Sequence, residues 1–370
     1  VAIKDYALTF DTNNLTIGRN SQPIEGTASD ATINVEGQSV TLIYIDGTQG
    51  WKVTDQGKKA DIGFAEFIVA TGGTITTSGN FKIHTFTGPG TFTVCSVGNA
   101  CGSNTVDYLV VAGGGGGATV SNSNNAGGGG GAGGYRESSG AASGCYSRSP
   151  LGACVSALPV SAQGYPIAVG AGGTASAPDN SQGNNGANSS FSTITSAGGG
   201  AGGGVYTGAQ KQGSAGGSGG GGGSGGATSP ATPTNGGAGN TPPVSPPQGS
   251  NGGTGSQPAG DPGAGGGGAT AVGQNAPTDG SGQGGAGGTS SINATPTARS
   301  GGGGGGGLGR AGAAGGSGGG GAGGPNDGPG GNGVAGTTNT GGGGGGATGG
   351  TGKKGGAGGS GIVIIRYKFQ

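Results

Sequence analysis

Glycine returns at every third position over long stretches of this chain, and this period restricts the fold more than any other feature. One row runs without a miss from Gly303 to Gly324, a second from Gly343 to Gly361 and a third from Gly213 to Gly225. Three residues per turn is the period of the extended polyproline-II helix, which forms no hydrogen bonds within itself. Its backbone N–H and C=O groups must therefore pair with neighbouring segments once the chain is compact.

Glycine at every third position lets neighbouring backbones approach closely, as on the axis of collagen. Here, however, many intervening positions are also glycine, proline is scarce in the rows, and the phase of the period is repeatedly reset. These features argue against collagen. We predict one chain that folds back and forth into a sandwich of about ten polyglycine-II helices over residues 113–361, with polar, proline-containing loops between them.

The composition also allows disorder as a second interpretation. The chain has 108 glycines and 18 prolines among its 370 residues, and such a composition is typical of linkers. Ordering one glycine costs about 1–2 kcal/mol of backbone entropy, whereas a hydrogen bond returns about 0.5–1.5 kcal/mol. Because these two quantities nearly cancel, an ordered bundle needs clamps at its ends.

Apolar, β-branched segments at both borders of the glycine-rich body are suited to act as such clamps. VDYLVV leads into the first glycine helix and GIVIIRYKF follows the last one. We expect residues 109–111 and 362–365 to lie in one sheet, together with residues 167–169. Residues 81–94 alternate on either side of Gly88-Pro89-Gly90, which predicts a β-hairpin.

The predicted fold is therefore all-β with almost no α-helix. Residues 1–55 indicate a small module of short strands, because apolar residues recur there among Asn, Asp, Gly and Thr. Residues 56–80 are expected to form a connector, residues 81–112 the hairpin and a clamp strand, residues 113–361 the glycine-rich body, and residues 362–370 the last clamp strand.

The four cysteines fall into two local pairs, Cys95 with Cys101 and Cys145 with Cys154. Neither pair has the spacing of a zinc knuckle, and the chain has a single histidine, His84, to assist. We expect two disulfides, each pinning a loop at the edge of the glycine-rich body, in a protein that functions outside the cell.

Charge and composition weigh against several classes of function. The formal net charge is zero and 8% of the residues are charged, so no basic surface for nucleic acid is indicated. The longest apolar runs are too short to cross a bilayer, and the lack of methionine suggests the C-terminal part of a longer protein. We expect no enzyme activity, cofactor or metal, and we interpret His84 as an exposed strand residue.

Residues 1–55 contain DTNNLTIGRNSQPIEG and QSVTLIYIDGTQGW. This stretch resembles the small β modules of bacteriophage tail fibres, in which a Leu-Thr-Ile strand, a glycine turn and a final tryptophan recur. The resemblance implies a homotrimer around a shared axis. The apolar set Leu15, Ile17, Leu42 and Trp51 would then be exposed on the single module.

The order VDYLVVAGGGGG … FSTITSAGGGAGGG … GSGIVIIRYKF resembles the glycine-rich C-terminal domains of phage tail fibres and tail-tip adhesins. The resemblance implies a virion protein, outside the cell, that binds a glycan or protein of the bacterial surface through loops at one end of a polyglycine-II sandwich. The loops of this chain lack the strong aromatic content of the best-known sandwich adhesins.

Simple alternation of outward and returning helices selects the loops that are expected at the far end. Tyr206 can stack on a sugar, and long or polar side chains can bond hydroxyls. The candidate receptor-binding residues are Tyr206, Lys211, Asn240, Gln248, Ile292, Asn293 and Arg299.

Two other functions remain open from the sequence. A structural spacer without a ligand would not need the long proline–threonine loops. An ice-binding protein would need a regular, flat array of Thr, Ser or Ala, and the irregular loops argue against it.

Overall fold

The computed structural model describes all residues except 58–64, 100–101, 122–124, 145, 153, 177–180, 206–210, 225–233, 257–261, 278–279, 310, 326–330 and 351. The chain forms two compact units, Val1–Glu66 with Gly98–Gly102 and Phe67–Val97 with Ser103–Gln370. The described residues are strands, turns and extended segments, apart from short 3-10 pieces at Pro150–Gly152 and Lys211. The all-β prediction is therefore confirmed.

The first unit is a small β module. One sheet has the order β1-β4-β5, and β2 pairs with β3 in a second sheet. The strands are β1 (Ala2–Lys4), β2 (Leu15–Ile17), β3 (Ala31–Ile33), β4 (Ser39–Asp46) and β5 (Gly50–Gly57). Leu42 is buried in the core of this module, and Leu15, Ile17 and Trp51 are half-buried against it. The expectation that these four side chains are exposed is therefore wrong.

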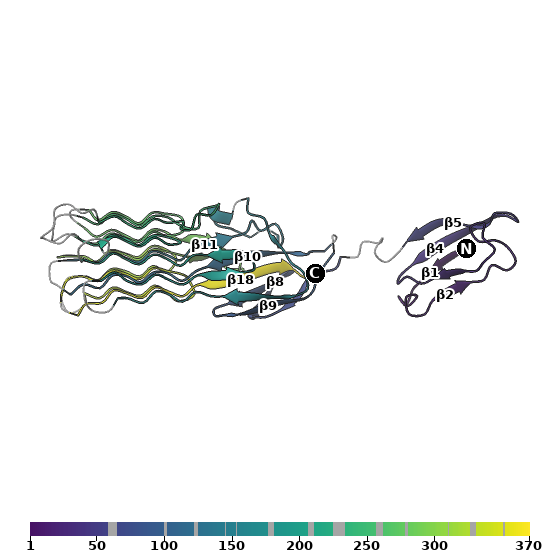
Figure 1. Ribbon diagram of the computed structural model, residues 1–370, viewed down its shortest axis with the longest axis horizontal. Helices are drawn as coiled ribbons and strands as arrows, with labels where there is room; N and C mark the ends of the chain where they lie inside the picture. Colours follow the sequence, from purple (N-terminus) through teal and green to yellow (C-terminus); the bar gives the residue numbers. More distant parts are fainter. Residues whose placement is uncertain are drawn as a thin grey trace. The chain divides into compact units, whose positions relative to one another are not determined.

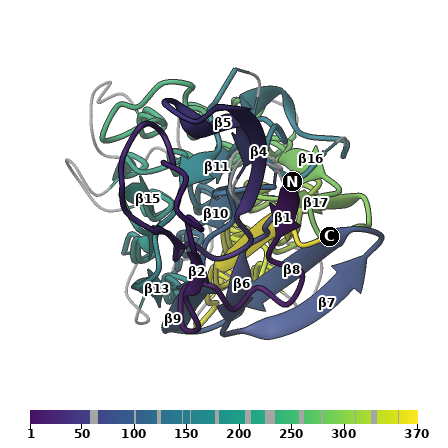
Figure 2. The same cartoon turned by 90° about the vertical axis from the view of Figure 1, so that its right-hand side faces the viewer.

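The second unit contains two larger sheets at one end of the glycine-rich body (Figure 1). The first has the order β11-β10-β18-β8-β7, with β12 also paired to β10, and the second has the order β15-β14-β13-β9-β6. β7 forms the outer edge of the first sheet (Figure 2). The strands are β6 (Val69–Thr71), β7 (Thr74–Ser78), β8 (Phe81–Phe86), β9 (Gly90–Ser96), β10 (Thr105–Val111), β11 (Tyr135–Glu137), β12 (Leu158–Pro159), β13 (Gly164–Ala168), β14 (Ser189–Phe191), β15 (Ile194–Ser196) and β18 (Ile362–Lys368).

The two strands that border the glycine-rich body pair with each other, as predicted. β10 and β18 are antiparallel neighbours in a register that places Leu109 opposite Ile364. The third predicted member is wrong, because β13 pairs with β9 and β14 in the other sheet. Ile167 therefore contributes to the clamp by packing across the core between the sheets, not by pairing with β10.

The predicted hairpin over residues 81–94 is also wrong. β8 pairs with β18 and β7, whereas β9 pairs with β13 and β6, so the turn at 87–89 crosses from one sheet to the other. Phe86 and Phe92 both point into the space between the sheets, and burying both rings there opposes pairing within one sheet. The expected connector 56–80 also contains two strands, β6 and β7.

The sheet of β10 and β18 is buried on both faces. Tyr108, Val110 and Tyr367 face the second sheet in one core, while Leu109 and Val111 face a separate cluster that is covered by loops. A continuous apolar strand is expected where both faces are covered, which accounts for the uninterrupted apolar character of VDYLVV after its Asp107.

His84 lies inside the core between the sheets, so its interpretation as an exposed residue is wrong. It is fully buried, and its Nδ1 is 2.7 Å from the carbonyl oxygen of Gly72. A carbonyl only accepts, so Nδ1 donates the proton and Nε2 accepts from the Tyr367 hydroxyl at 3.1 Å. Burial lowers the pKa of His84, which keeps the ring neutral.

The glycine segments have the hydrogen-bond pattern of polyglycine-II helices. Along segment 112–120, every third N–H donates to the same neighbour: those of Gly113, Gly116 and Thr119 all reach segment 181–187. The acceptor steps back by three residues each time, so the two segments are antiparallel and share a three-residue period. This pattern matches the period predicted from the sequence.

The remaining N–H groups of segment 112–120 donate in the same way to segments 128–134 and 353–359. Its carbonyl oxygens accept from segments 199–202 and 344–347, which run parallel to it because their donors step forward by three residues. In Figure 1 these helices run side by side away from the strands, and Figure 2 looks nearly along them. The array is therefore bonded through its backbone in several directions around each helix.

At many glycines of the array there is no room for even a Cβ atom. A Cβ on Gly115 would collide with the carbonyl oxygen of Gly200, and one on Gly130 would collide with the carbonyl oxygen of Gly115. Glycine is required at such positions because the neighbouring backbones lie in contact there.

The glycine row from 213 to 225, which the sequence predicts as one helix, contains a reversal. The N–H of Gly220 donates to Ser214 and that of Gly223 donates to Lys211, both at 2.9 Å, so the two halves are antiparallel. The chain bends at 216–218. This row therefore forms two short antiparallel segments where one helix was expected.

The expected disulfides are not present at the described cysteines. Cys95 and Cys154 are free, exposed thiols, whereas Cys101 and Cys145 lie outside the described residues. The ends of the glycine-rich body are held together by the two packed sheets and by the backbone hydrogen bonds of the array.

Candidate functional site

The loop between β16 (Gly288–Ser290) and β17 (Thr297–Arg299) was expected at the far end of the array, but it lies at the sheet end. Ile292 is fully buried in the cluster that covers β10 and β18, and its carbonyl accepts from Arg366 Nη1 at 3.3 Å. Arg299 is also buried. Asn293 is half-buried and its Nδ2 donates to Thr297 Oγ1 at 3.4 Å. Ile292 and Arg299 are therefore not available to a receptor.

The loop at 240–249 also lies at the sheet end and not at the far end. Asn240 Oδ1 accepts from the N–H groups of Val244 and Gln248 and so organises the loop. Gln248 is buried; its Oε1 accepts from the Ala197 N–H at 2.8 Å, and its carbonyl accepts from the Tyr135 N–H. These contacts fix the loop to the sheets, so the placement predicted for Asn240 and Gln248 is wrong.

The reversal at 216–218 explains why the placement failed. The N–H of Gly217 donates to Gly198 and that of Ser218 donates to Ala132, both close to the strands, so the chain turns at the sheet end there. Because the prediction alternated the loops between the two ends of the array, one unrecognised turn places every later loop at the wrong end. The sequence offered no signal for it, because glycine also occupies the helices on both sides.

Two buried carboxylates at the sheet end were not singled out from the sequence. Asp107 accepts hydrogen bonds from the Ser138 and Ser143 hydroxyls, at 2.7 and 2.6 Å, and from the N–H groups of Gly140 and Ser143. It thereby ties residues 138–143 to β10. The only available signal was a single acidic residue at the start of the apolar strand.

Glu137 is the second buried carboxylate. Its Oε2 accepts from the Tyr135 hydroxyl at 3.0 Å and from the Ser149 hydroxyl at 2.6 Å, while Oε1 has no hydrogen-bond partner among the described residues. Burial raises the pKa of Glu137, and the hydrogen bonds from Ser149 oppose that rise. Arg299 lies close enough for its charge to interact with Glu137, and burial lowers the pKa of Arg299.

A raised carboxylate pKa can mark an acid–base catalyst, but the space beside Glu137 is too small for a substrate. The cavity that it lines with Tyr135 and Leu151 measures about 10 Å³, which is the size of a single water molecule. Glu137 therefore has a structural role: it accepts hydrogen bonds from Tyr135 and Ser149. We assign it no catalytic role.

The far end of the array, opposite the sheets, is closed by buried side chains. Val120, Val205 and Ala347 form a small apolar cluster there. Buried hydroxyls bond the last backbone groups: Ser224 Oγ accepts from the Ala126 N–H at 2.9 Å, and Thr348 Oγ1 donates to the Gly324 carbonyl at 2.5 Å. We call this the free end, because the described helices end there without a sheet beyond them.

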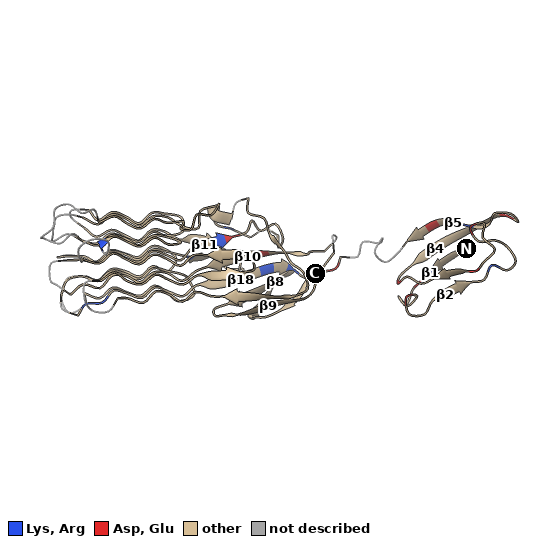
Figure 3. Ribbon diagram, viewed as in Figure 1, with Lys and Arg blue, Asp and Glu red and all other residues tan. Residues whose placement is uncertain are grey.

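Ser224 and Val205 lie at the free end, and each precedes a segment that is outside the described residues. In the sequence, residues 225–233, GGATSPATP, follow Ser224, and residues 206–210, YTGAQ, stand between Val205 and Lys211. Tyr206 lies outside the described residues. Lys211 is at the free end as expected, but its side chain is buried. Charged residues are sparse along the described helices (Figure 3).

The described residues contain no group of three or more His, Cys, Asp and Glu side chains arranged to hold a metal. The part of the chain that the structure describes also has no helix of the length and apolar character needed to cross a bilayer.

Comparison with known proteins identifies the family of the chain. No curated protein matches the chain. A family model described as a glycine-rich domain matches residues 85–368, which begins within β8 and ends with the last residue of β18. The chain therefore belongs to this glycine-rich domain family.

Proposed function

We propose that this chain is the distal part of a bacteriophage tail fibre and acts as a receptor-binding adhesin for a glycan or protein on the outer surface of a bacterium. The proposal places the protein on the virion, outside the cell, as a homotrimer without a cofactor or catalytic activity. The resemblance of residues 1–55 and 81–370 to tail-fibre domains supports it, and the distribution of side chains in the array supports it independently.

The main support for this proposal is that the two ends of the array differ in the kind of residues they carry. At the sheet end, Gln248 and Ile292 are buried and serve packing. Ser224 lies at the free end, and the segment that follows it in the sequence, GGATSPATP at 225–233, is polar and proline-containing, as is QPAGD at 257–261. Conserving the array while varying such segments would change specificity without changing the fold, because binding residues commonly lie on loops held by a rigid scaffold.

A spacer without a ligand is the second candidate. It is favoured by one observation, namely that four of the residues expected to contact a receptor, Lys211, Gln248, Ile292 and Arg299, are buried. The same observation is compatible with an adhesin whose contacts come from other residues of the free end. A binding experiment directed at that end separates the two functions.

The test replaces residues 225–233 and 257–261 with glycine–serine segments of the same lengths and measures adsorption of the labelled full chain to a panel of bacteria. We expect adsorption of the replaced chain to fall at least tenfold. Val272→Ser, an exposed residue at the sheet end that is 63% accessible, is the control and should adsorb like the wild type.

Adsorption by neither the wild type nor the replaced chain would favour the spacer, whereas equal and measurable adsorption by both would show that the contact lies outside residues 225–233 and 257–261. Pre-treating the cells with protease or with periodate distinguishes a protein receptor from a glycan receptor, because only the matching treatment should abolish adsorption.

A further inference from the structure

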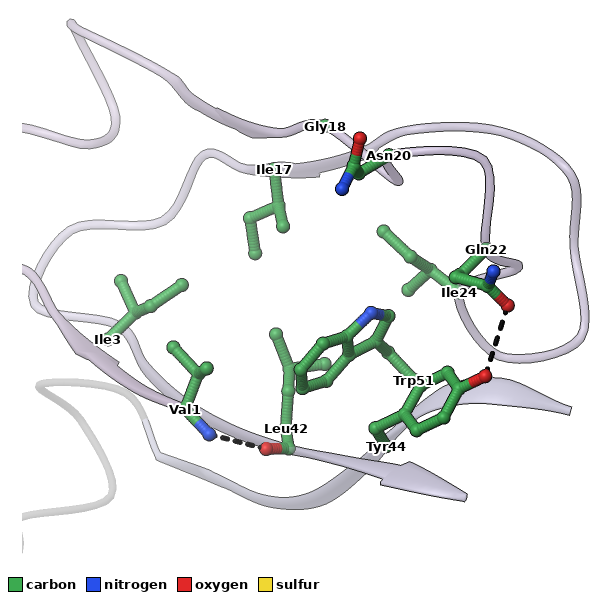
Figure 4. A pocket seen from close by; sticks show the side chains of 10 residues that line it. All are labelled: Val1, Ile3, Ile17, Gly18, Asn20, Gln22, Ile24, Leu42, Tyr44 and Trp51. Carbon is green, nitrogen blue, oxygen red and sulfur yellow. Dashed lines mark hydrogen bonds between the residues drawn. The ribbon is translucent and has the colours of Figure 1, made fainter. Parts of the chain in front are cut away.

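The first unit has an open apolar pocket that neither the array nor the proposed host contact uses. Its volume is about 440 Å³. Figure 4 shows the side chains of Ile3, Ile17, Ile24 and Trp51 converging on it from opposite sides. A module of this size would ordinarily fill such a space with its own side chains, because protein interiors are closely packed.

The lining of the pocket indicates the chemistry of its occupant. The walls are aliphatic and aromatic, none of the lining side chains is charged at neutral pH, and the α-ammonium of Val1 is already bonded to the Leu42 carbonyl at 2.7 Å. Two amides, Asn20 and Gln22, lie at the rim (Figure 4). Gln22 Oε1 already accepts from the Tyr44 hydroxyl at 3.2 Å, which leaves the Gln22 NH2 group as a donor. The pocket therefore suits a neutral ring with one polar end.

The first unit itself presents a side chain of this kind. Tyr6 is 95% exposed, which is the largest value among the exposed large apolar side chains of the described residues. Tyrosine combines an apolar ring with a hydroxyl that needs a hydrogen-bond partner when it is buried. Other large apolar side chains on the same unit, such as Ile43 and Ile45, are at least half exposed. Such concentrations of exposed apolar residues mark protein interfaces.

Hydrogen bonds to the side chain of the preceding residue, Asp5, fix the loop that carries Tyr6. The carboxylate of the neighbouring Asp5 is buried and accepts from the N–H groups of Thr9, Phe10 and Gly37 at 2.9–3.0 Å. These bonds fix the backbone next to Tyr6. A fixed loop loses little conformational entropy when its side chain docks, so the exposed ring is prepared for binding.

We propose that a second copy of this chain docks its Tyr6 ring into this pocket, with the hydroxyl bonded to the amides of Asn20 and Gln22. Tyr6 is not one of the residues that line the pocket, so the contact joins two different surfaces of the module. Such a head-to-tail contact can close into a ring of identical copies. The inference rests on the self-association in the proposed function and supplies its contact; it does not depend on host binding.

The experiment measures the association of the full chain by analytical ultracentrifugation and by fluorescence. Trp51 is the single tryptophan of the chain and lines the pocket, so its emission should shift as the chain is diluted and the pocket empties. We expect Tyr6→Ala to weaken association at least tenfold and to abolish this shift. Tyr6→Phe should have a smaller effect, because it keeps the ring and loses only the hydroxyl.

Val272→Ala removes an exposed apolar side chain from the other unit and should associate like the wild type. Association that Tyr6→Ala leaves unchanged, or a wild type that is monomeric at all concentrations, would overturn the inference. So would a shift of Trp51 emission in a monomeric chain on adding glucose or an apolar dye, since the occupant would then be a small molecule.

Failure of this inference is separable from failure of the proposed function. If the Tyr6→Ala chain still adsorbs to bacteria and still associates, the docking contact is contradicted and the adhesin function is not. If the wild type associates through Tyr6 but adsorbs to no bacterium, only the proposed adhesin function is contradicted.

Discussion

The strands of the second unit and the helices that continue from them are held together by different parts of the same chain. β10 buries Tyr108, Leu109 and Val110 in two apolar cores. A few residues later, Gly115 and Gly116 have no side chain to bury, and their N–H groups donate to separate neighbouring helices. One region depends on side chains that fill space, and the other depends on the absence of side chains.

This difference explains why the glycine array begins and ends in the sandwich. The entropy lost by each glycine nearly offsets its hydrogen bonds, so the array gains little stability by itself. Burying apolar side chains contributes about 25 cal/mol per Å², and this contribution is available where β10 and β18 pair. The sandwich therefore supplies the stability that fixes the two ends of the array.

The largest effect is expected from Phe92→Ala in the sandwich. Phe92 is fully buried between the two sheets and contacts the rings of His84 and Phe191 edge-on. Removing a buried phenylalanine costs about 3–5 kcal/mol of unfolding free energy, which denaturant unfolding measures. Val97→Ala, at a residue that is 37% exposed, is the control and should change little.

The same variant tests whether the array depends on the sandwich. Hydrogen exchange of glycine amides in the array should accelerate together with that of β10. Array amides that stay protected while the sandwich opens would show that the array is stable without its clamp.

A smaller loss is expected from Gly115→Ala in the array, where adding one methyl group is the perturbation. The new Cβ would collide with the carbonyl oxygen of Gly200, and overpacking of this kind costs about 1–3 kcal/mol. Gly280→Ala is the matched control, because its Cβ would meet only Pro277 Cγ at 3.6 Å. Thermal unfolding measures both variants; equal melting temperatures would contradict the role assigned to glycine in the interior.

The smallest effect is expected from pH, through His84. Its folded-state pKa is lowered by burial, so the unfolded chain binds more protons below the ordinary histidine pKa of about 6.5. The stability linked to neutral His84 is therefore present above about pH 6.5 and is lost as the pH falls toward the lowered pKa. Because the chain has a single histidine, its NMR titration can be followed directly, and His84→Gln should remove this part of the pH dependence.

The candidate site was less predictable than the fold. That Asn240 and Gln248 belong to a loop between helices could be predicted, but the end at which this loop lies depended on counting every reversal. The turn at 216–218 consists of glycine and serine within a glycine row, so neither the period nor the composition distinguishes it. Ile292 offered a better signal, since a lone large aliphatic residue in a polar loop is more often buried than exposed.

By itself the sequence determined the all-β class, the three-residue period of the body and the pairing of its two border strands. These properties follow from local chemistry: glycine spacing sets the close approach of backbones, and β-branched runs favour strands. Only the tertiary structure decided that β8 and β9 belong to different sheets, that His84 is buried, and which loops lie at each end. Those outcomes depend on which distant surfaces cover one another, and residues that follow each other along the chain do not contain that information.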